Sequence, residues 1–291
     1  MKVSIGIPFY NPGHVFKSTI ESVLAQTFTD FELILLNDGS KDESVEIANS
    51  FEDSRVRVVN DGTNKGLPAR LNELIALSNG EYIARMDADD LISPERLAKQ
   101  VAYLDEHADI DLVSTGLCSI TNDCKVIGYR TPAERTNPEI TVKQAIFGQS
   151  DIAHATIMAR KAWFERNRYN EKAKLMEDYQ LWIDAAVKND LNAGFISTPL
   201  YFYREESSVS PQKAINAYRN QIAIVKQQYS RYLSTKDNLH FTLLMRAKMA
   251  FVYVLNLVNL SNYLLAVRNK STEQETEKLS ELQQQLDSIR S

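Results

Sequence analysis

Residues 82–97 read YIARMDADDLISPERL, and this stretch decides how the rest of the chain is interpreted. Residues 82–86 are typical of a β-strand, and the carboxylates of Asp87, Asp89 and Asp90 follow directly. Ser93 and Pro94 then predict the start of a helix, with the serine as N-cap and the proline at the first helical position. A strand, an acidic cluster and a helix in this order predict one unit of an α/β fold.

Strands and helices alternate on the N-terminal side of this stretch. The expected strands are 3–9, 31–36, 55–59 and 82–86, and the expected helices are 15–24, 40–51, 67–78 and one from Ser93. The helix over 40–51 would open with a capping box made by Ser40 and Glu43. Residues 31–36 (FELILL) are almost all apolar, as in a strand that is covered on both faces. This alternation predicts a mostly parallel central sheet flanked by helices.

The order of elements is looser after residue 110. Strands are expected over 111–120, 126–130, 155–159 and 195–203, and helices over 138–147 and 178–187. From Pro211 onward the pattern is almost entirely helical. We therefore expect an α/β domain over residues 1–210 and a helical C-terminal region over 211–291.

Bulk composition excludes some classes of protein. The formal net charge of −5 argues against a nucleic-acid binder, which normally carries a basic surplus. The two cysteines, Cys118 and Cys124, are expected to be free thiols in a reducing cytoplasm. The chain enters its first strand without a basic and apolar leader segment, which favours a cytoplasmic location.

Residues 249–267 contain no charged side chain and are long enough to span a membrane. However, Asn256, Asn259 and Asn262 recur at helical spacing and form one polar stripe. This pattern favours a helix packed on a neighbour, or one lying on a membrane surface, over a helix that crosses lipid.

Three expected strands end in polar residues: 8–11 (PFYN), 37–40 (NDGS) and 87–90 (DADD). In an open parallel sheet, ligands bind outside the carboxyl ends of the strands. Parallel strands would bring these three clusters to one edge, where Tyr10 offers a flat face to a planar ring. The sequence therefore predicts a ligand cleft at this edge.

The acidic cluster at 87–90 is the sharpest chemical signal. Three neighbouring carboxylates repel one another unless a cation or a proton compensates them. Carboxylates together with phosphate oxygens are the usual ligands of Mg²⁺ and Mn²⁺. A solvated acidic loop that only caps the following helix is the alternative. The position beside two other polar strand ends favours a metal site.

Several motifs together resemble the family-two glycosyltransferases of the GT-A fold. They are VSIGIPFYN (3–11), SVLAQTFTDFELILLNDGSKDES (22–44), NKGLPARLN (64–72), GEYIARMDADDLISPERL (80–97) and MEDYQLW (176–182). The resemblance covers about residues 3–210. It implies an inverting transfer of a sugar from a nucleoside diphosphate, usually UDP, with Mn²⁺ or Mg²⁺. The Asp-Ala-Asp-Asp variant is similar to bacterial enzymes that build cell-surface polysaccharide or lipooligosaccharide.

The resemblance also implies a nucleotide-sugar half at about residues 1–110. The residues that would bind the donor there are Pro8, Tyr10, Asp38, Arg70, Asp87 and Asp89. Pro8 and Tyr10 would line the nucleobase, and Asp38 would accept a hydrogen bond from the uracil imide. Arg70 would also face the nucleotide. Asp87 would bond the ribose or the donor sugar, and Asp89 would hold the metal on the diphosphate. Taken singly, Asp38 also suits a turn, Arg70 a helix surface and Tyr10 a core.

The acceptor half would cover about residues 111–210. Matched to the family, Asp178 in EDYQLW would be the catalytic base and Glu177 an acceptor contact; without the family, two acids at a helix start also suit the helix dipole. His154 would either line the acceptor pocket or be a satisfied buried imidazole. Trp182 is expected to be core packing rather than a sugar platform.

One motif departs from the family. LYFYREESSVS (200–210) is similar to a Tyr-Arg-x-His-x-x-Ser ending, but Glu206 stands at the histidine position. Arg204 is kept and would neutralise phosphate. This departure puts a metal contact from the C-terminal side in doubt, and Glu206 either replaces it or is an exposed loop acid.

The leading hypothesis is a metal-dependent transferase that uses a UDP-sugar donor and a saccharide or lipid-linked oligosaccharide acceptor. It would lie at the inner face of the cell membrane, with the C-terminal helices contacting the membrane or forming a homodimer. A sugar-phosphate nucleotidyltransferase is one alternative, although residues 6–14 (GIPFYNPGH) lack the glycine- and basic-rich loop that a triphosphate needs. A non-catalytic nucleotide-sugar-binding or scaffold protein is the other.

Overall fold

The computed structural model describes residues 1–173, 175–205, 210–258 and 275–290. Within these residues the strands are β1 (Val3–Phe9), β2 (Phe31–Asn37), β3 (Val56–Val59), β4 (Tyr82–Arg85), β5 (Leu91–Ile92), β6 (Leu112–Ile120), β7 (Val126–Arg130), β8 (Arg135–Thr136), β9 (Met158–Arg160) and β10 (Ala193–Arg204). They form one sheet in the order β3-β2-β1-β4-β9-β6-β10-β5, with β7 on β6 and β8 on β10. β1 to β4 pair with one another in parallel, and β6 pairs with β10 in parallel, whereas β9 and β5 run antiparallel to their neighbours.

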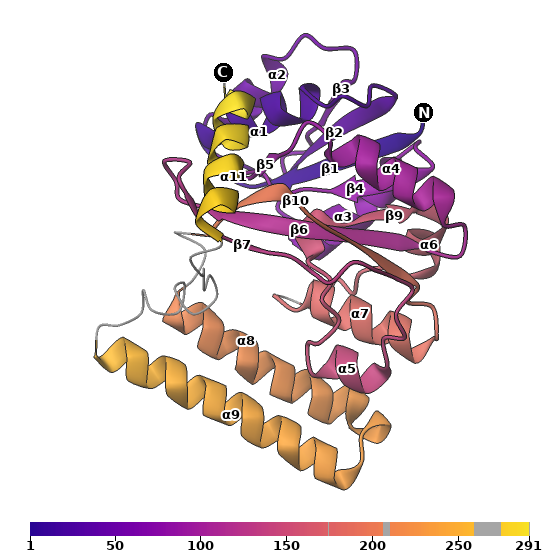
Figure 1. The fold of residues 1–291 in the computed structure, drawn as a ribbon, viewed down its shortest axis with the longest axis vertical. Helices are drawn as coiled ribbons and strands as arrows, with labels where there is room; N and C mark the ends of the chain where they lie inside the picture. The colour runs from indigo at the N-terminus through magenta and orange to yellow at the C-terminus, as the bar shows by residue number, and fades with distance from the viewer. Residues whose placement is uncertain (174, 206–209, 259–274, 291) are drawn as a thin grey trace.

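Helices cover both faces of the sheet (Figure 1). One apolar layer joins α1 (Val15–Leu24), α2 (Ser44–Asn49) and α4 (Arg96–Glu106) to the inward side chains of β1, such as Ile5. The other layer joins α3 (Leu67–Leu77), α6 (Lys161–Arg166) and α7 (Glu177–Val187) to Leu36 and Ile83. The nearly all-apolar β2 is buried along its whole length, which confirms that it is covered on both faces. The structure is therefore the expected mixed α/β fold with a mostly parallel central sheet.

Two expected helix starts are wrong. The helix α2 begins at Ser44 without a side-chain cap, because the Ser40 hydroxyl instead accepts a hydrogen bond from the Asn11 amide (3.1 Å). The helix α4 begins at Arg96, and the Ser93 amide donates to the Leu200 carbonyl (3.0 Å). In both places a residue expected to cap a helix joins two segments that lie far apart in the sequence.

The helix expected over 138–147 is also shorter than predicted. It is α5 (Val142–Ile146), and a capping box made by Thr141 and Gln144 opens it. The segment 155–159 holds the short turn η1 (His154–Thr156) before β9 begins. The strands β5 and β8 and the helix α6 were not expected, since each is short and is defined by its partner rather than by a sequence pattern.

The helices after residue 210 follow two different courses (Figure 1). α8 (Pro211–Ile224) and α9 (Thr235–Leu257) form a hairpin through the turns η2 (Val225–Tyr229) and η3 (Ser230–Tyr232). No helix within the described ranges is both long enough and apolar enough to cross a membrane. Of the residues 249–267, those from 259 on lie outside the described residues, including Asn259 and Asn262.

α11 (Glu275–Arg290) packs back against the sheet. Its Leu282 and Leu286 are buried in one apolar cluster with Cys118, Cys124 and Phe202. Two glutamines add polar contacts, because Gln283 Oε1 accepts from the Val126 amide (2.8 Å) and Gln285 Nε2 donates to Ser93 Oγ (2.7 Å). The division into residues 1–210 and 211–291 stays a prediction, and α11 shares an apolar cluster with the first of these regions.

The packing of α11 predicts a loss of stability on truncating Leu286. Leu286→Ala should lower the free energy of unfolding by about 3 kcal/mol, because it removes a fully buried side chain and leaves a cavity. The exposed Gln284 on the same helix provides the control, and Gln284→Ala should change the free energy by less than about 0.5 kcal/mol. Urea unfolding measures both, and equal stability of the two variants would show that α11 is not part of the folded body.

Candidate active site

The ends of β1 and β2 meet at one edge of the sheet, as their sequences predicted. The strands pair in parallel up to Phe9 and Asn37, and the Asp38 amide donates to the Phe9 carbonyl (2.8 Å). Asn11 adopts a left-handed backbone (φ 51°), and its side-chain oxygen accepts from the Lys41 amide (2.7 Å). These contacts hold Pro8 and Tyr10 beside the loop that carries Asp38.

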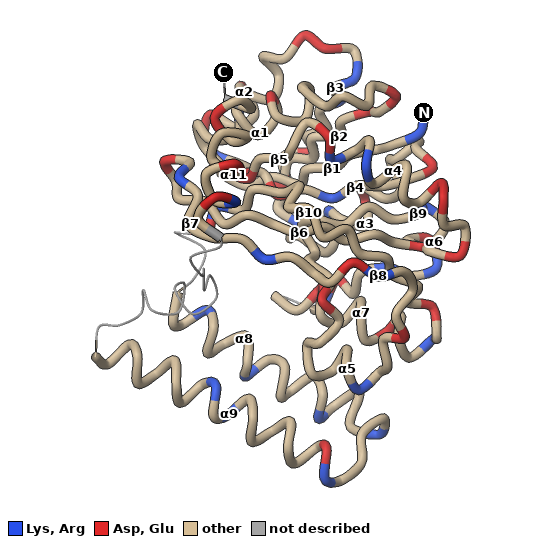
Figure 2. The backbone as a smooth tube through the Cα atoms, in the orientation of Figure 1, with Lys and Arg blue, Asp and Glu red and all other residues tan. Residues whose placement is uncertain are grey.

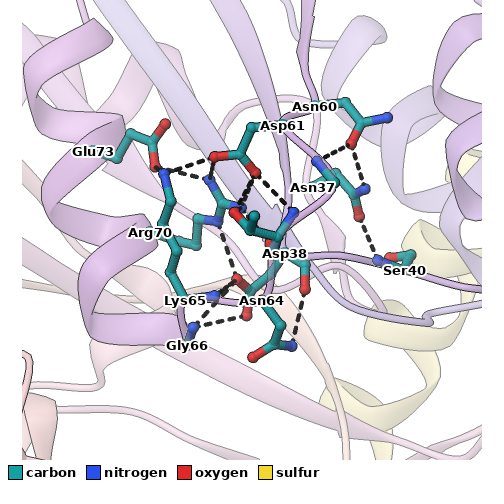
Figure 3. A network of polar contacts seen from close by, with 12 residues as sticks. Asn37, Asp38, Ser40, Asn60, Asp61, Asn64, Lys65, Gly66, Arg70 and Glu73 are labelled. Atoms are coloured by element: carbon teal, nitrogen blue, oxygen red, sulfur yellow. Dashed lines mark hydrogen bonds and ion pairs between the residues drawn. The ribbon is translucent and has the colours of Figure 1, made fainter.

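Asp38 is fixed by a polar network on its inner side (Figure 3). Its carboxylate accepts hydrogen bonds from the backbone amides of Lys65 (2.7 Å) and Gly66 (3.1 Å) and from Arg70 Nε (3.0 Å). Gly66 has a φ of 85°, a conformation that favours glycine and that lets the amide turn toward the carboxylate. Asp38 is thus held in one orientation by two neighbouring backbone amides and one guanidinium.

Arg70 is fully buried, so it is not the helix-surface charge that its sequence position alone would also allow. Its guanidinium lies between Asp38, Asp61 (2.6 Å) and Glu73 (2.8 Å), and it also donates to the Thr63 carbonyl (2.6 Å). Burial disfavours the charge of Arg70, but the hydrogen bonds to the three carboxylates outweigh burial and raise its pKa. A role of Arg70 in nucleotide binding stays a prediction, and the structure allows it to act through Asp38.

The three acids of the 87–90 cluster have different partners. Asp87 forms an ion pair with Arg85, which precedes it by two residues. Side chains two residues apart in an extended segment point to the same side. Asp90 is fully buried, and it accepts hydrogen bonds from the Tyr201 hydroxyl (2.7 Å) and the Arg204 amide (2.7 Å). Burial, followed by the charges of Asp87 and Asp89, raises the pKa of Asp90 well above its ordinary value. Asp90 therefore ties the acidic loop to β10.

Asp89 lines a cavity of about 290 Å³ together with Tyr10, Asn11 and Arg204. Burial, followed by the charge of Asp87, raises the pKa of the Asp89 carboxyl. Arg204 is anchored beside it by hydrogen bonds from its guanidinium to the carbonyls of Asp89 and Asn122. Tyr10 is 56% exposed, so its ring is not part of the core. A hollow with one acid, one cation and one exposed aromatic ring suits a ligand with phosphate and planar parts.

A larger cavity of about 580 Å³ adjoins the same loop and holds Asp87, Arg85, His154 and Asp178 among its lining residues. Asp178 stands in the first turn of α7, and its carboxylate accepts from the Tyr179 amide (2.7 Å). Burial raises the pKa of Asp178, while this backbone hydrogen bond and Arg85 act in the opposite direction. Burial also raises the pKa of the adjacent, half-buried Glu177.

His154 lines the same cavity as Asp178, and Trp182 contacts the His154 ring from the core. His154 Nε2 lies 2.8 Å from the Tyr169 hydroxyl, and burial together with Arg85 lowers the pKa of His154 well below its ordinary value. The imidazole is therefore neutral near pH 7 and can exchange hydrogen bonds but supplies no charge. Trp182 is 5% exposed and packs against Trp163, which confirms that it is core packing.

Sequence reasoning missed four charged residues of the larger cavity, which are Arg85, Arg130, Asp151 and Glu205. Glu205 is buried, and it pairs with Arg130 (2.6 Å) and accepts from Ser119 Oγ (2.7 Å). A sequence signal for Arg85 did exist: side chains alternate between the two faces of a strand, so Arg85 and Asp87, two residues apart, are expected on the same face. Glu205 had no comparable signal, and Glu206, at the family's histidine position, lies outside the described residues.

The possible metal-binding side chains at this edge of the sheet fit one kind of metal site. In the part of the chain that the structure describes, no three His, Cys, Asp or Glu side chains gather into a ready-made metal cage. Mg²⁺ and similar ions keep several waters and bind one or two carboxylates together with substrate phosphates. Asp89, next to Arg204 in a small cavity, fits an ion that is completed by a diphosphate.

Comparisons with known proteins agree with this geometry. A family model described as "Glycosyl transferase family 2" matches residues 4–168. EpsE of Bacillus subtilis (strain 168), which is named as a glycosyltransferase, is 32% identical over 238 residues, which are 80% of this chain and 83% of EpsE.

Two solved structures share the fold. Staphylococcus aureus TarS 1–349 in complex with UDP-GlcNAc has a TM-score of 0.62 at 22% identity, over 85% of this chain and 72% of that chain. PcManGT, a mannosyltransferase of Pyrobaculum calidifontis in complex with GDP-Man and Mn²⁺, has a TM-score of 0.58 at 13% identity, over 99% of this chain and 86% of that chain. At these identities the likeness shows the fold alone, and it confirms the expected GT-A architecture.

The network around Arg70 predicts a large effect of removing its charge. Arg70→Met should lower the free energy of unfolding by about 3 kcal/mol or more, because it leaves partly buried carboxylates without their cation. Arg70→Lys should recover only part of this loss, since an ammonium cannot reproduce the fork that meets three acids. Arg57→Met, at an exposed arginine of β3, serves as the control, and denaturant unfolding that ranks it equal to Arg70→Met would contradict the account.

Proposed function

The chain belongs to glycosyl transferase family 2, and from this premise we propose that it moves a hexose or N-acetylhexosamine from a UDP-sugar to a saccharide or lipid-linked acceptor, with inversion and with help from a divalent metal. The product would serve cell-surface polysaccharide biosynthesis. One observation carries the proposal: Asp87 at the end of β4 and Asp178 at the start of α7 line a single cavity of about 580 Å³. Donor-side and acceptor-side carboxylates thus share one space.

The donor nucleotide would lie along the edge formed by β1, β2 and β4. Pro8 and the exposed ring of Tyr10 would face the nucleobase, and Asp38 would accept a hydrogen bond from the uracil imide. The groups that hold Asp38 approach mainly one of its oxygens: Oδ1 accepts from Lys65, Gly66 and Arg70, whereas Oδ2 accepts from Gly66. Because each carboxylate oxygen has two lone pairs, Oδ2 retains capacity for a ligand.

The diphosphate would lie in the smaller cavity, between Asp89 and Arg204. Asp89 would hold Mn²⁺ or Mg²⁺ against the phosphate oxygens, where such an ion neutralises the charge that develops on the leaving group. Arg204 would add a second positive charge, and its guanidinium is already fixed by the carbonyls of Asp89 and Asn122. Asp87 would bond the ribose or the donor sugar, with Arg85 holding its carboxylate in place.

Asp178 would act as the base of a single displacement. As the acceptor oxygen bonds to the anomeric carbon, its proton passes to the Asp178 carboxylate and the bond to the diphosphate breaks on the opposite side. A raised pKa suits this role, since a more basic carboxylate takes up a proton more readily. Glu177 and the neutral His154 would contact the acceptor, for which the cavity beside α7 has room.

Asp178→Asn tests the assignment of the base. Release of UDP from a panel of UDP-sugars, measured with acceptor and Mn²⁺, should fall by about 10²- to 10⁴-fold, the usual contribution of a general base. The folded state should be no less stable than the wild type at pH 7, because the amide removes a buried charge that the fold disfavours. Asp184→Asn, on the same helix and hydrogen-bonded to Tyr229 outside the cavity, should retain activity. Undiminished turnover by Asp178→Asn would exclude Asp178 as the base.

The pH profile of the wild type gives a second readout of the same residue. The base works only as a carboxylate, so kcat/KM should fall as the pH drops through the pKa of Asp178. Burial raises this pKa, and the acid limb should therefore lie above the ordinary aspartate value of 3.8. The residual activity of Asp178→Asn should lack this limb, and an unchanged limb in that variant would assign it to another group.

A further inference from the structure

The helix α9 exposes apolar side chains along one face. Leu239, Leu243, Val254 and Leu257 are 54–64% exposed, and their spacing places them on one side of the helix. The opposite side is buried through Phe241, Met245, Val252 and Leu255. A helix that is apolar on both sides normally has a partner on both sides. Among the residues that the structure describes, α8 and Phe147 of the body pack against the buried side.

Positive charge surrounds this exposed face. Residues 211–258 contain the basic side chains Lys213, Arg219, Lys226, Arg231, Lys236, Arg246 and Lys248. Asp237 is the only acidic residue of this segment, and it is paired with Lys143 of the body (2.7 Å). The chain as a whole has the opposite balance, with 33 basic and 38 acidic residues. Figure 2 shows the contrast, because the α8–α9 hairpin carries blue positions and a single red one.

The charge pattern discriminates between occupants of the apolar face. A second copy of the hairpin would bring two basic segments against each other, which like-charge repulsion disfavours. An anionic lipid surface offers the complementary charge together with an apolar layer just beneath it. The exposed Phe251 and Tyr253 on α9 are residue types that bind at this boundary.

We propose that the α8–α9 hairpin docks the protein on an anionic lipid bilayer, with the exposed face of α9 lying in the plane of the headgroups. The 23 residues of α9 span roughly 34 Å, so the contact is long and parallel to the surface. Lys236 and Arg246, both exposed on α9, contact lipid phosphates from the same helix. This mode needs no membrane-spanning segment.

The hairpin is also bonded to the helix that carries Asp178. Gln180 of α7 donates to Gln228 Oε1 (2.9 Å), and the Tyr229 hydroxyl donates to Asp184 of α7 (2.6 Å). Docking therefore fixes α7, and the cavity at its start, relative to the bilayer. This step rests on the proposed function, and it assigns the acceptor to the class of lipid-linked saccharides.

Vesicle flotation of the full chain tests the docking surface without any enzymatic readout. The wild type should bind vesicles of phosphatidylcholine mixed with phosphatidylglycerol, should not bind phosphatidylcholine alone, and should dissociate as salt is raised. Leu239→Ser with Leu243→Ser should lower the partition coefficient by at least about tenfold. Lys236→Gln with Arg246→Gln should have a similar effect, about tenfold or more. Because all four side chains are exposed, the variants should unfold at the wild-type temperature.

A matched pair on the body serves as the control. Lys17→Gln with Lys99→Gln makes the same change in net charge on α1 and α4, and it should leave vesicle binding unchanged. Equal binding to both vesicle compositions, no binding to either, or wild-type binding by the leucine variant would overturn the proposal. A dimer in light scattering that the leucine variant abolishes, without vesicle binding, would assign the face to a second copy. Vesicle binding by a protein that lacks transferase activity would support docking and reject the proposed function.

Discussion

Carboxylates gathered at the carboxyl edge of the sheet are the constraint on which the rest of the site depends. Asp89, Asp90 and Asp178 all have pKa values raised by burial, and they lie around Asp87. A fold keeps a fully buried charge only where it has a partner. Asp90 has its partners within the protein, in Tyr201 and the backbone of Arg204. Asp89 and Asp178 instead line cavities, where a ligand can complete them.

The segments that carry Asp87 and His154 are held together by buried polar contacts. Arg96 of α4 is fully buried, and its guanidinium donates to the carbonyls of Arg85 (3.0 Å), Ala155 (3.3 Å) and Ile157 (3.2 Å). Burial lowers the pKa of Arg96 to about 10, so it remains charged at neutral pH. One cation thus joins the end of β4, just before the acidic cluster, to the segment that follows His154. This contact helps to hold Asp87 and Asp178 around the same cavity.

Much of this arrangement was predictable because it follows from local pattern. The apolar run of β2 and the polar strand ends at 8–11 and 37–40 indicated a parallel sheet with a cleft at one edge, and the structure pairs them there. Ser40 shows the limit of local pattern: it has the sequence of a helix cap, but its hydroxyl accepts from Asn11 across the edge. Arg70 shows the same limit. It is one basic residue in a motif, and only its tertiary partners reveal that it is buried beneath Asp38.

Titration calorimetry of UDP and GDP, with and without Mn²⁺, tests most directly whether this edge of the sheet is a nucleotide-diphosphate site. The account predicts that UDP binds more tightly than GDP, that Mn²⁺ strengthens UDP binding, and that Asp89→Asn abolishes the effect of the metal. Metal-independent UDP binding of the same strength in the wild type and in Asp89→Asn, or no binding of either nucleotide, would contradict it.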